Sequence, residues 1–187
     1  MARALRVDKT ARAAEPFSTE QRLWAPWRYA YLRSGPSAKR ACIFCFGSPG
    51  PAERRKRLVL HVAERSVVML NRYPYNNGHL MIAPRRHVAS PELLTPEEQL
   101  ELSQVLAQSV RLLRGALSPS GFNLGSNIGA SAGAGFAEHM HWHVVPRWDG
   151  DNNFMPVLAS TRVLSQHLLD SYARLNPVFM TLKAGLS

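Results

Sequence analysis

Cysteine, acidic residues and long apolar runs are all scarce in this chain of 187 residues. Its two cysteines are too few for a disulfide framework. No segment approaches the roughly 18 consecutive apolar residues that a membrane span requires. Residues 1–20 also contain no apolar core of the kind found in secretory signals. These absences favour a protein of a reducing compartment, and we expect it to be cytoplasmic with no membrane partner.

The shortage of acidic residues gives the chain a strong positive charge. Lys and Arg total 23 against 13 Asp and Glu, which gives a net charge of +10 at pH 7. Such a balance favours polyanionic partners, namely nucleic acid, a polyphosphate or a membrane surface. Part of the excess lies in the first twelve residues and in a basic run at 54–57, where solubility alone would explain it. The hydrophobic fraction of 45% is ordinary for a globular protein and excludes a disordered chain.

The length corresponds to one domain. We expect a flexible basic N-terminal arm over residues 1–18 and a single domain over residues 19–187. That domain would begin with an aromatic segment at 23–32, continue through a loop at 34–57 and end with a helical extension. The aromatic segment should pack on the domain or on a second subunit, because exposed aromatic clusters usually mark contact surfaces.

Apolar patterning predicts short strands and two helices. The expected strands are 58–62, 66–71, 79–84, 122–128 and 139–147. Thr95 and Glu98 form a capping box, so a long helix should begin there and end near Gly115. A last amphipathic helix is expected around residues 164–175. A meander of strands with one inserted long helix predicts an α+β fold with a mostly antiparallel, five-stranded sheet.

Three alternating histidines are the strongest chemical signal. His139, His141 and His143 alternate with Met140 and Trp142 in the segment HMHWHVV. Residues two apart on a strand share a face, so three imidazoles would stand in a row while the apolar residues face a core. The residues alone leave three possibilities open: a metal site, anion binding, or nucleophilic and acid–base catalysis. The glycine-rich segment GASAGAG just before them favours a phosphate ester, because such loops bring backbone amides close to phosphate oxygens.

The HMHWHVV segment resembles the signature of the histidine-triad family of nucleotide hydrolases and transferases. LNRYPYNNGHLMIAPRRH at 70–87 is similar to that family's nucleotide-binding segment, and NLGSNIGASAGAG at 123–135 to its phosphate loop. The segments LWAPWRYAYL, CIFC and PRWDGDNNFM resemble the bacterial branch of diadenosine tetraphosphate phosphorylase-like and hydrolase-like proteins. The resemblance implies the HIT-like fold and cleavage of an adenylyl compound at its α-phosphorus.

The resemblance also implies roles for individual residues. His141 would be the nucleophile that forms a nucleotidyl-histidine intermediate. His143 would contact the phosphate and assist the leaving group. His79 would lie behind the triad, either as a catalytic or as a buried structural histidine. The implied nucleotide-binding residues are Asn71, Asn127, Gly133, Gly135, His143 and Trp148. For Trp148, adenine stacking and ordinary packing both remain open.

Cys42 and Cys45 form a second candidate site. The C-x2-C spacing suits tetrahedral zinc, but one such pair supplies only half of the ligands. The resemblance implies a structural zinc held by Cys42, Cys45, His87 and His139. The alternative is a pair of reduced, metal-free thiols.

One departure from the family pattern bears on the acceptor. Many family hydrolases carry Gln four residues before the first triad histidine, where this chain has Gly135. The smaller residue favours inorganic phosphate over water. The expected substrate is therefore diadenosine tetraphosphate or a related adenine nucleotide, and the expected assembly is a homodimer. The alternatives are a nucleoside phosphoramidate hydrolase and a DNA-binding deadenylase of repair, although we do not expect nucleic acid as a partner.

Overall fold

A computed structural model of the chain describes residues 41–151 and 166–182. The expected basic arm at 1–18 and the aromatic segment at 23–32 lie outside these residues, so the division into arm and domain stays a prediction. Within the described part, no helix combines the length and the hydropathy needed to cross a membrane.

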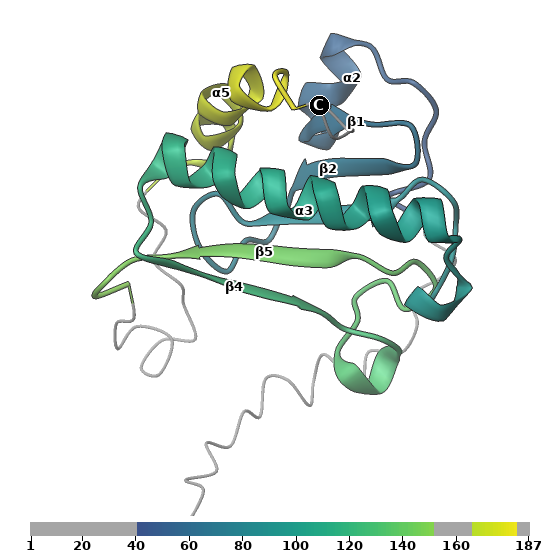
Figure 1. Cartoon of the computed structure of the whole chain (residues 1–187). Coiled ribbons are helices and arrows are strands. Elements are labelled where there is room, and N and C mark those ends of the chain that lie inside the picture. Colours follow the sequence, from purple (N-terminus) through teal and green to yellow (C-terminus); the bar gives the residue numbers. More distant parts are fainter. Residues whose placement is uncertain (1–40, 152–165, 183–187) are drawn as a thin grey trace, which may run out of the picture. The chain divides into compact units, whose positions relative to one another are not determined.

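An antiparallel sheet of five strands forms the centre of the fold (Figure 1). Its strands lie in the order β1-β2-β3-β5-β4, and every neighbouring pair is antiparallel. The strands are β1 (Val59–Val62), β2 (Ser66–Leu70), β3 (Leu80–Pro84), β4 (Gly121–Ser126) and β5 (Trp142–Arg147). The predicted α+β class and the five-stranded sheet are confirmed.

The long helix α3 (Pro96–Leu117) begins at the predicted capping box. The hydroxyl of Thr95 accepts the backbone N–H of Glu98 at 3.3 Å, and the Glu98 carboxylate accepts the N–H of Thr95 at 2.9 Å. The last helix, α5 (Leu168–Phe179), lies beside α3 and ends a few residues later than predicted (Figure 1). Both helices cover the same face of the sheet.

The prediction of a loop throughout residues 34–57 is wrong, because α2 (Pro51–Arg57) is helical. Pro51 occupies the first turn, where its missing N–H costs nothing. Glu53 and Arg57 form an ion pair one turn apart, and Leu58 ends the helix in the left-handed conformation. The basic run is thus the last turn of a short helix, where cations interact favourably with the helix dipole.

Strand alternation separates two apolar clusters on opposite faces of the sheet. Leu80, Ile82 and Val144 pack in the cluster that includes residues of α3 and α5. Met69 and Met81 belong to the second cluster, which also contains Phe44 and is covered by the segment around the two cysteines. The functional histidines belong to this second face, because His143 pairs with Met81 in register.

The predicted strand at 139–147 is three residues too long at its beginning, because β5 starts at Trp142. The backbone N–H of His139 donates to Phe136 at 3.3 Å, and that of Met140 donates to Val88 at 2.7 Å. The chain therefore bends through a turn before it joins β3. Met140 still packs in the helix-side core as predicted, with 2% of its surface exposed.

Replacing Thr95 by Ala should lower the free energy of unfolding by about 1 kcal/mol, because the first turn of α3 loses a reciprocal cap. Urea unfolding followed by circular dichroism measures the change. Ser103→Ala, on the exposed face of the same helix, is the matched control and should leave stability unchanged or slightly higher. Equal stability of Thr95→Ala and wild type would contradict the role of the cap.

Candidate active site and metal centre

The ring of His141 is held by a hydrogen bond to a backbone carbonyl. Its Nδ1 lies 3.0 Å from the carbonyl oxygen of His139, and only 4% of the residue is exposed. A carbonyl can only accept, so Nδ1 carries the hydrogen in the neutral ring and Nε2 keeps its lone pair. The unprotonated Nε2 is the atom that a nucleophilic histidine needs.

A second chain of hydrogen bonds sets the tautomer of His143. The backbone N–H of Tyr75 donates to Nδ1 of His79 at 3.0 Å, which leaves the hydrogen of the neutral His79 ring on Nε2. That Nε2 lies 2.9 Å from Nδ1 of His143. His143 therefore accepts at Nδ1 and carries its own hydrogen on Nε2. The predicted place of His79 behind the triad has this geometric support: it is fully buried and orients His143.

Burial keeps the imidazoles of the triad neutral. Desolvation lowers the pKa of His141, against which the hydrogen bond to the His139 carbonyl acts only in part. Desolvation and the nearby His141 ring lower the pKa of His143 to about 4. The two rings lie 4.9 Å apart, centroid to centroid, at 75°. At neutral pH the site thus combines an uncharged nucleophile with an uncharged N–H donor on neighbouring side chains.

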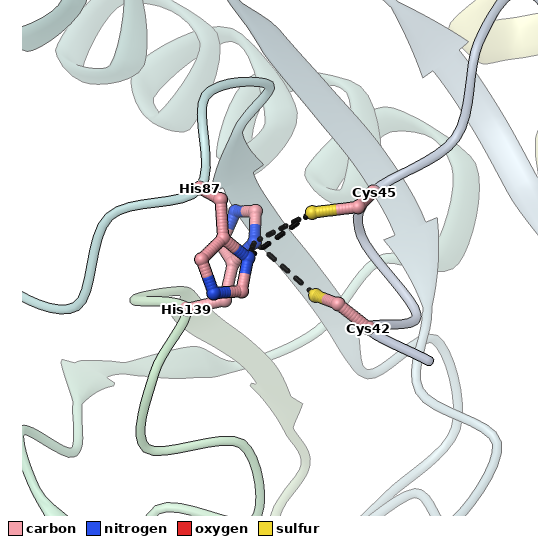
Figure 2. A group of neighbouring side chains, drawn as sticks. All are labelled: Cys42, Cys45, His87 and His139. Carbon is pink, nitrogen blue, oxygen red and sulfur yellow. Dashed lines mark hydrogen bonds between the residues drawn. The ribbon is translucent and has the colours of Figure 1, made fainter. Parts of the chain in front are cut away.

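Cys42, Cys45, His87 and His139 form one cluster, whose ligand atoms all lie within 4.8 Å of one another (Figure 2). The two Nδ1 atoms are 3.2 Å apart, and three of the S–N distances are 3.1 Å (Cys45 to His87), 3.3 Å (Cys42 to His139) and 3.5 Å (Cys45 to His139). With Zn–N bonds of about 2.0 Å and Zn–S bonds of about 2.3 Å, tetrahedral geometry separates two nitrogens by about 3.3 Å and a sulfur from a nitrogen by about 3.5 Å. The donor set therefore fits a tetrahedral ion.

The chemistry of the donors agrees with this geometry. Nε2 of His139 lies 2.8 Å from the carbonyl of Pro84, so its hydrogen is on Nε2 and Nδ1 is free to bind a metal. Burial and the adjacent Cys42 raise the pKa of the Cys45 thiol to about 11. Two neighbouring thiols resist losing both protons unless a cation compensates their charge, which a bound metal would do. The described residues thus bring together all four predicted ligands.

Asn71 and Trp148 both lie at the end of the sheet where β2 and β5 end and β3 begins. Asn71 follows β2 beside the loop that carries His79, and its Oδ1 accepts the N–H of Tyr73 at 2.9 Å. Trp148 follows the far end of β5, five residues beyond His143 and about 16 Å away along the strand. The loop that carries His79 contacts the turn that contains Trp148, because Asn76 and the backbone N–H of Trp148 both donate to the carboxylate of Asp151. The nucleotide-binding roles of Asn71 and Trp148 stay predictions.

The phosphate-loop candidates lie just before the triad. The amide of Asn127 donates to the carbonyl of Ala132 and closes the loop after β4. The N–H of Gly133 donates to Ala130 at 2.9 Å, so this amide is engaged within the loop and does not point at a phosphate in this conformation. Gly135 lies in the exposed turn that follows. The nucleotide-binding roles of these residues stay predictions.

Two residues that sequence reasoning missed contact the histidines. The ring of Tyr75 lies 4.8 Å from that of His79, in addition to its backbone hydrogen bond. The ring of Phe44 lies 5.0 Å from His139 and 4.9 Å from His141. Because Phe44 lies between Cys42 and Cys45 in the sequence, its closeness to the histidines could have been predicted. The hydrogen bond from Tyr75 is made by its backbone amide, so the residue type gives no signal for that bond.

The fold and this site define a class of small α+β proteins with neighbouring histidines on the face of an antiparallel sheet opposite to α3 and α5. The family model described as "HIT domain" matches residues 53–150. A relative named AP-4-A phosphorylase, from Mycobacterium tuberculosis, is 39% identical over 156 residues, which cover 81% of this chain and 80% of the relative. The chain therefore belongs to the HIT family.

Solved structures agree with this fold. A hypothetical histidine triad nucleotide-binding protein from Sulfolobus tokodaii matches with a TM-score of 0.56 and 24% identity, covering 74% of this chain and 89% of that chain. A Zn-bound histidine triad family protein from Mycobacterium smegmatis matches with a TM-score of 0.50 and 24% identity, covering 66% of this chain and 84% of that chain.

The imidazole of His143 should titrate with a pKa near 4, because burial and His141 disfavour its protonated form. Since the unfolded chain has the ordinary value of about 6.5, it takes up the proton first as the pH falls. The contribution of this ring to stability should therefore be constant above pH 6.5 and decrease from there toward pH 4.

Proton NMR titration measures this pKa, with His143→Gln identifying the resonance. Urea unfolding at several pH values measures the slope, which should be smaller in that variant. A midpoint for His143 near 6.5 would contradict the assigned environment.

Proposed function

We propose that the chain is a nucleotidyl-transferring enzyme that cleaves diadenosine tetraphosphate or a related adenylyl compound at the α-phosphorus. The observation that carries the proposal is the pair of tautomers, with an Nε2 lone pair on His141 beside an Nε2–H on His143. The name AP-4-A phosphorylase of the M. tuberculosis relative supports this substrate class.

In the first step, Nε2 of His141 attacks the α-phosphorus while the bond from that phosphorus to the bridging oxygen breaks. With diadenosine tetraphosphate the leaving group is ATP, which is stable as an anion and does not need a proton. His143 therefore only needs to donate a hydrogen bond from Nε2 to the oxygen on which charge develops. A neutral ring can donate this hydrogen bond without transferring its proton, and the low pKa of His143 keeps the ring neutral.

The second step transfers the adenylyl group from His141 to inorganic phosphate. A phosphate oxygen attacks the phosphorus, the P–N bond breaks and ADP forms, so the overall products are ADP and ATP. The hydrogen on Nδ1 of His141 keeps the substituted ring positively charged, which makes it a good leaving group, and the His139 carbonyl stabilises that charge. Gly135 supports phosphate as acceptor, because it offers no side-chain amide to hold a water.

We also propose that Cys42, Cys45, His87 and His139 hold zinc. The donor set and distances support this ion, and the M. smegmatis neighbour is described as Zn-bound. With all four positions filled by protein, the ion would supply structural stability and no open coordination site. A cytoplasmic location, a homodimer and the absence of a nucleic-acid partner stay predictions.

Incubation with diadenosine tetraphosphate and inorganic phosphate should yield ADP and ATP, and chromatography separates these from the AMP and ATP of hydrolysis. His141→Ala should lose several orders of magnitude in turnover and still bind nucleotide, because no other group splits the reaction into two steps. His61→Ala, on β1, is the matched control and should retain activity. Retention of more than about a tenth of the rate in His141→Ala would rule out covalent catalysis by this residue.

Protein purified without chelator should contain about one zinc per chain. Cys42→Ser should reduce the zinc content and lower the thermal unfolding midpoint, because metal binding contributes to folding. Zinc added back to chelated wild type should restore the midpoint, whereas magnesium should not, since it prefers oxygen ligands. Protein that contains no zinc and keeps its midpoint in Cys42→Ser would refute the metal site.

A further inference from the structure

Phe44 connects the metal-binding cluster to the proposed nucleophile. It lies between Cys42 and Cys45 and is 1% exposed, in the apolar cluster on the histidine face of the sheet. Its ring lies 4.9 Å from that of His141 at an interplanar angle of 32°, and 5.0 Å from that of His139 at 47°. One aromatic ring thus packs against both the first and the second histidine of the triad.

We propose that Phe44 is a positioning residue that fixes the orientation of the His141 imidazole, and that metal binding at Cys42 and Cys45 fixes Phe44 in turn. The inference rests on the proposed function of His141 as the nucleophile. It gives the metal cluster an effect on the reaction, although the ion has no open coordination position.

The hydrogen bond of His141 does not orient its ring completely. The bond from Nδ1 to the His139 carbonyl fixes one atom and the tautomer, but the ring can still tilt about that contact. Phe44 packs against one side of the ring at an interplanar angle of 32° and restricts this tilt, while the ring of His143 packs against it at 75°. The direction of the Nε2 lone pair is thereby fixed, and attack at phosphorus depends on that direction.

The position of Phe44 depends in turn on the short segment between the cysteines. Phe136 packs edge-on against Phe44 at 6.2 Å. Both ends of the segment carry a metal-ligand candidate, so binding of one ion to both sulfurs fixes the residues between them. Loss of the ion would release the segment and, with it, the aromatic surface on which His141 rests.

The test compares Phe44→Ala with a matched deletion in the other core. Phe179→Ala removes a ring that is also fully buried but lies in the helix-side cluster. Both variants should lose thermal stability. Only Phe44→Ala should slow the single-turnover formation of the nucleotidyl-histidine, by about tenfold or more, with KM nearly unchanged. Phe44→Leu, which restores apolar bulk, should recover part of the rate and provides a folded alternative if the alanine variant is too unstable.

Nitrogen NMR of the His141 ring supplies a readout that does not depend on turnover. Wild type should show the Nδ1–H tautomer with one set of sharp ring resonances. Phe44→Ala should keep that tautomer but show broadened ring resonances, because the ring can then tilt about its hydrogen bond. Removal of zinc from wild type should reproduce both the slower transfer and the broadened resonances, whereas its removal from Phe44→Ala should add little, because the two changes act through one contact.

The possible outcomes separate the two hypotheses. Wild-type rate and sharp ring resonances in Phe44→Ala would overturn the inference, as would equal slowing by Phe179→Ala or strictly additive effects of zinc removal. Absence of any nucleotidyl-histidine in wild type would instead overturn the proposed function, and the NMR comparison would still decide whether Phe44 orients the ring.

Discussion

The hydrogen bond between His141 and the backbone carbonyl of His139 is the constraint on which the rest of the site depends. It decides which nitrogen of His141 carries the lone pair. The carbonyl belongs to a residue whose ring is itself held at both nitrogens, by Pro84 on one side and by the cysteines on the other. The orientation of the proposed nucleophile is therefore tied to the candidate metal ligands through His139.

The two faces of the sheet divide stability from chemistry. Met140 and Val144 extend into the core beneath α3 and α5, while the histidines that alternate with them face the opposite side. The same short segment is thus anchored by burial of its apolar residues, while its imidazoles form hydrogen bonds with backbone carbonyls and with side chains outside the segment. This explains how two buried histidines and a half-buried one are tolerated in uncharged form. The apolar half of the segment contributes the free energy that offsets their desolvation.

Local patterns predicted the elements well and the contacts between them less well. The capping box at Thr95 and the alternation around Met140 depend on near neighbours, so the sequence alone indicated them. The start of β5 at Trp142 depends on a bond from Met140 to the distant Val88, and no local pattern reveals it. The four metal ligands were grouped only through family resemblance, whereas the contact of Phe44 with His141 required the packed structure.

The net charge of +10 and the neutral histidines serve different stages of the proposed reaction. Long-range attraction by basic residues outside the triad, such as those of α2, raises the rate at which an anionic substrate arrives. Such attraction acts on substrate and transition state alike, so it lowers KM without raising kcat. The hydrogen bond from a neutral His143 strengthens only as charge moves onto the leaving oxygen. A cationic group in place of His143 would bind the ground-state polyphosphate as tightly as the transition state, and would therefore not raise kcat. A neutral donor at the site, with the positive charge kept on the surface, avoids this loss of catalytic effect.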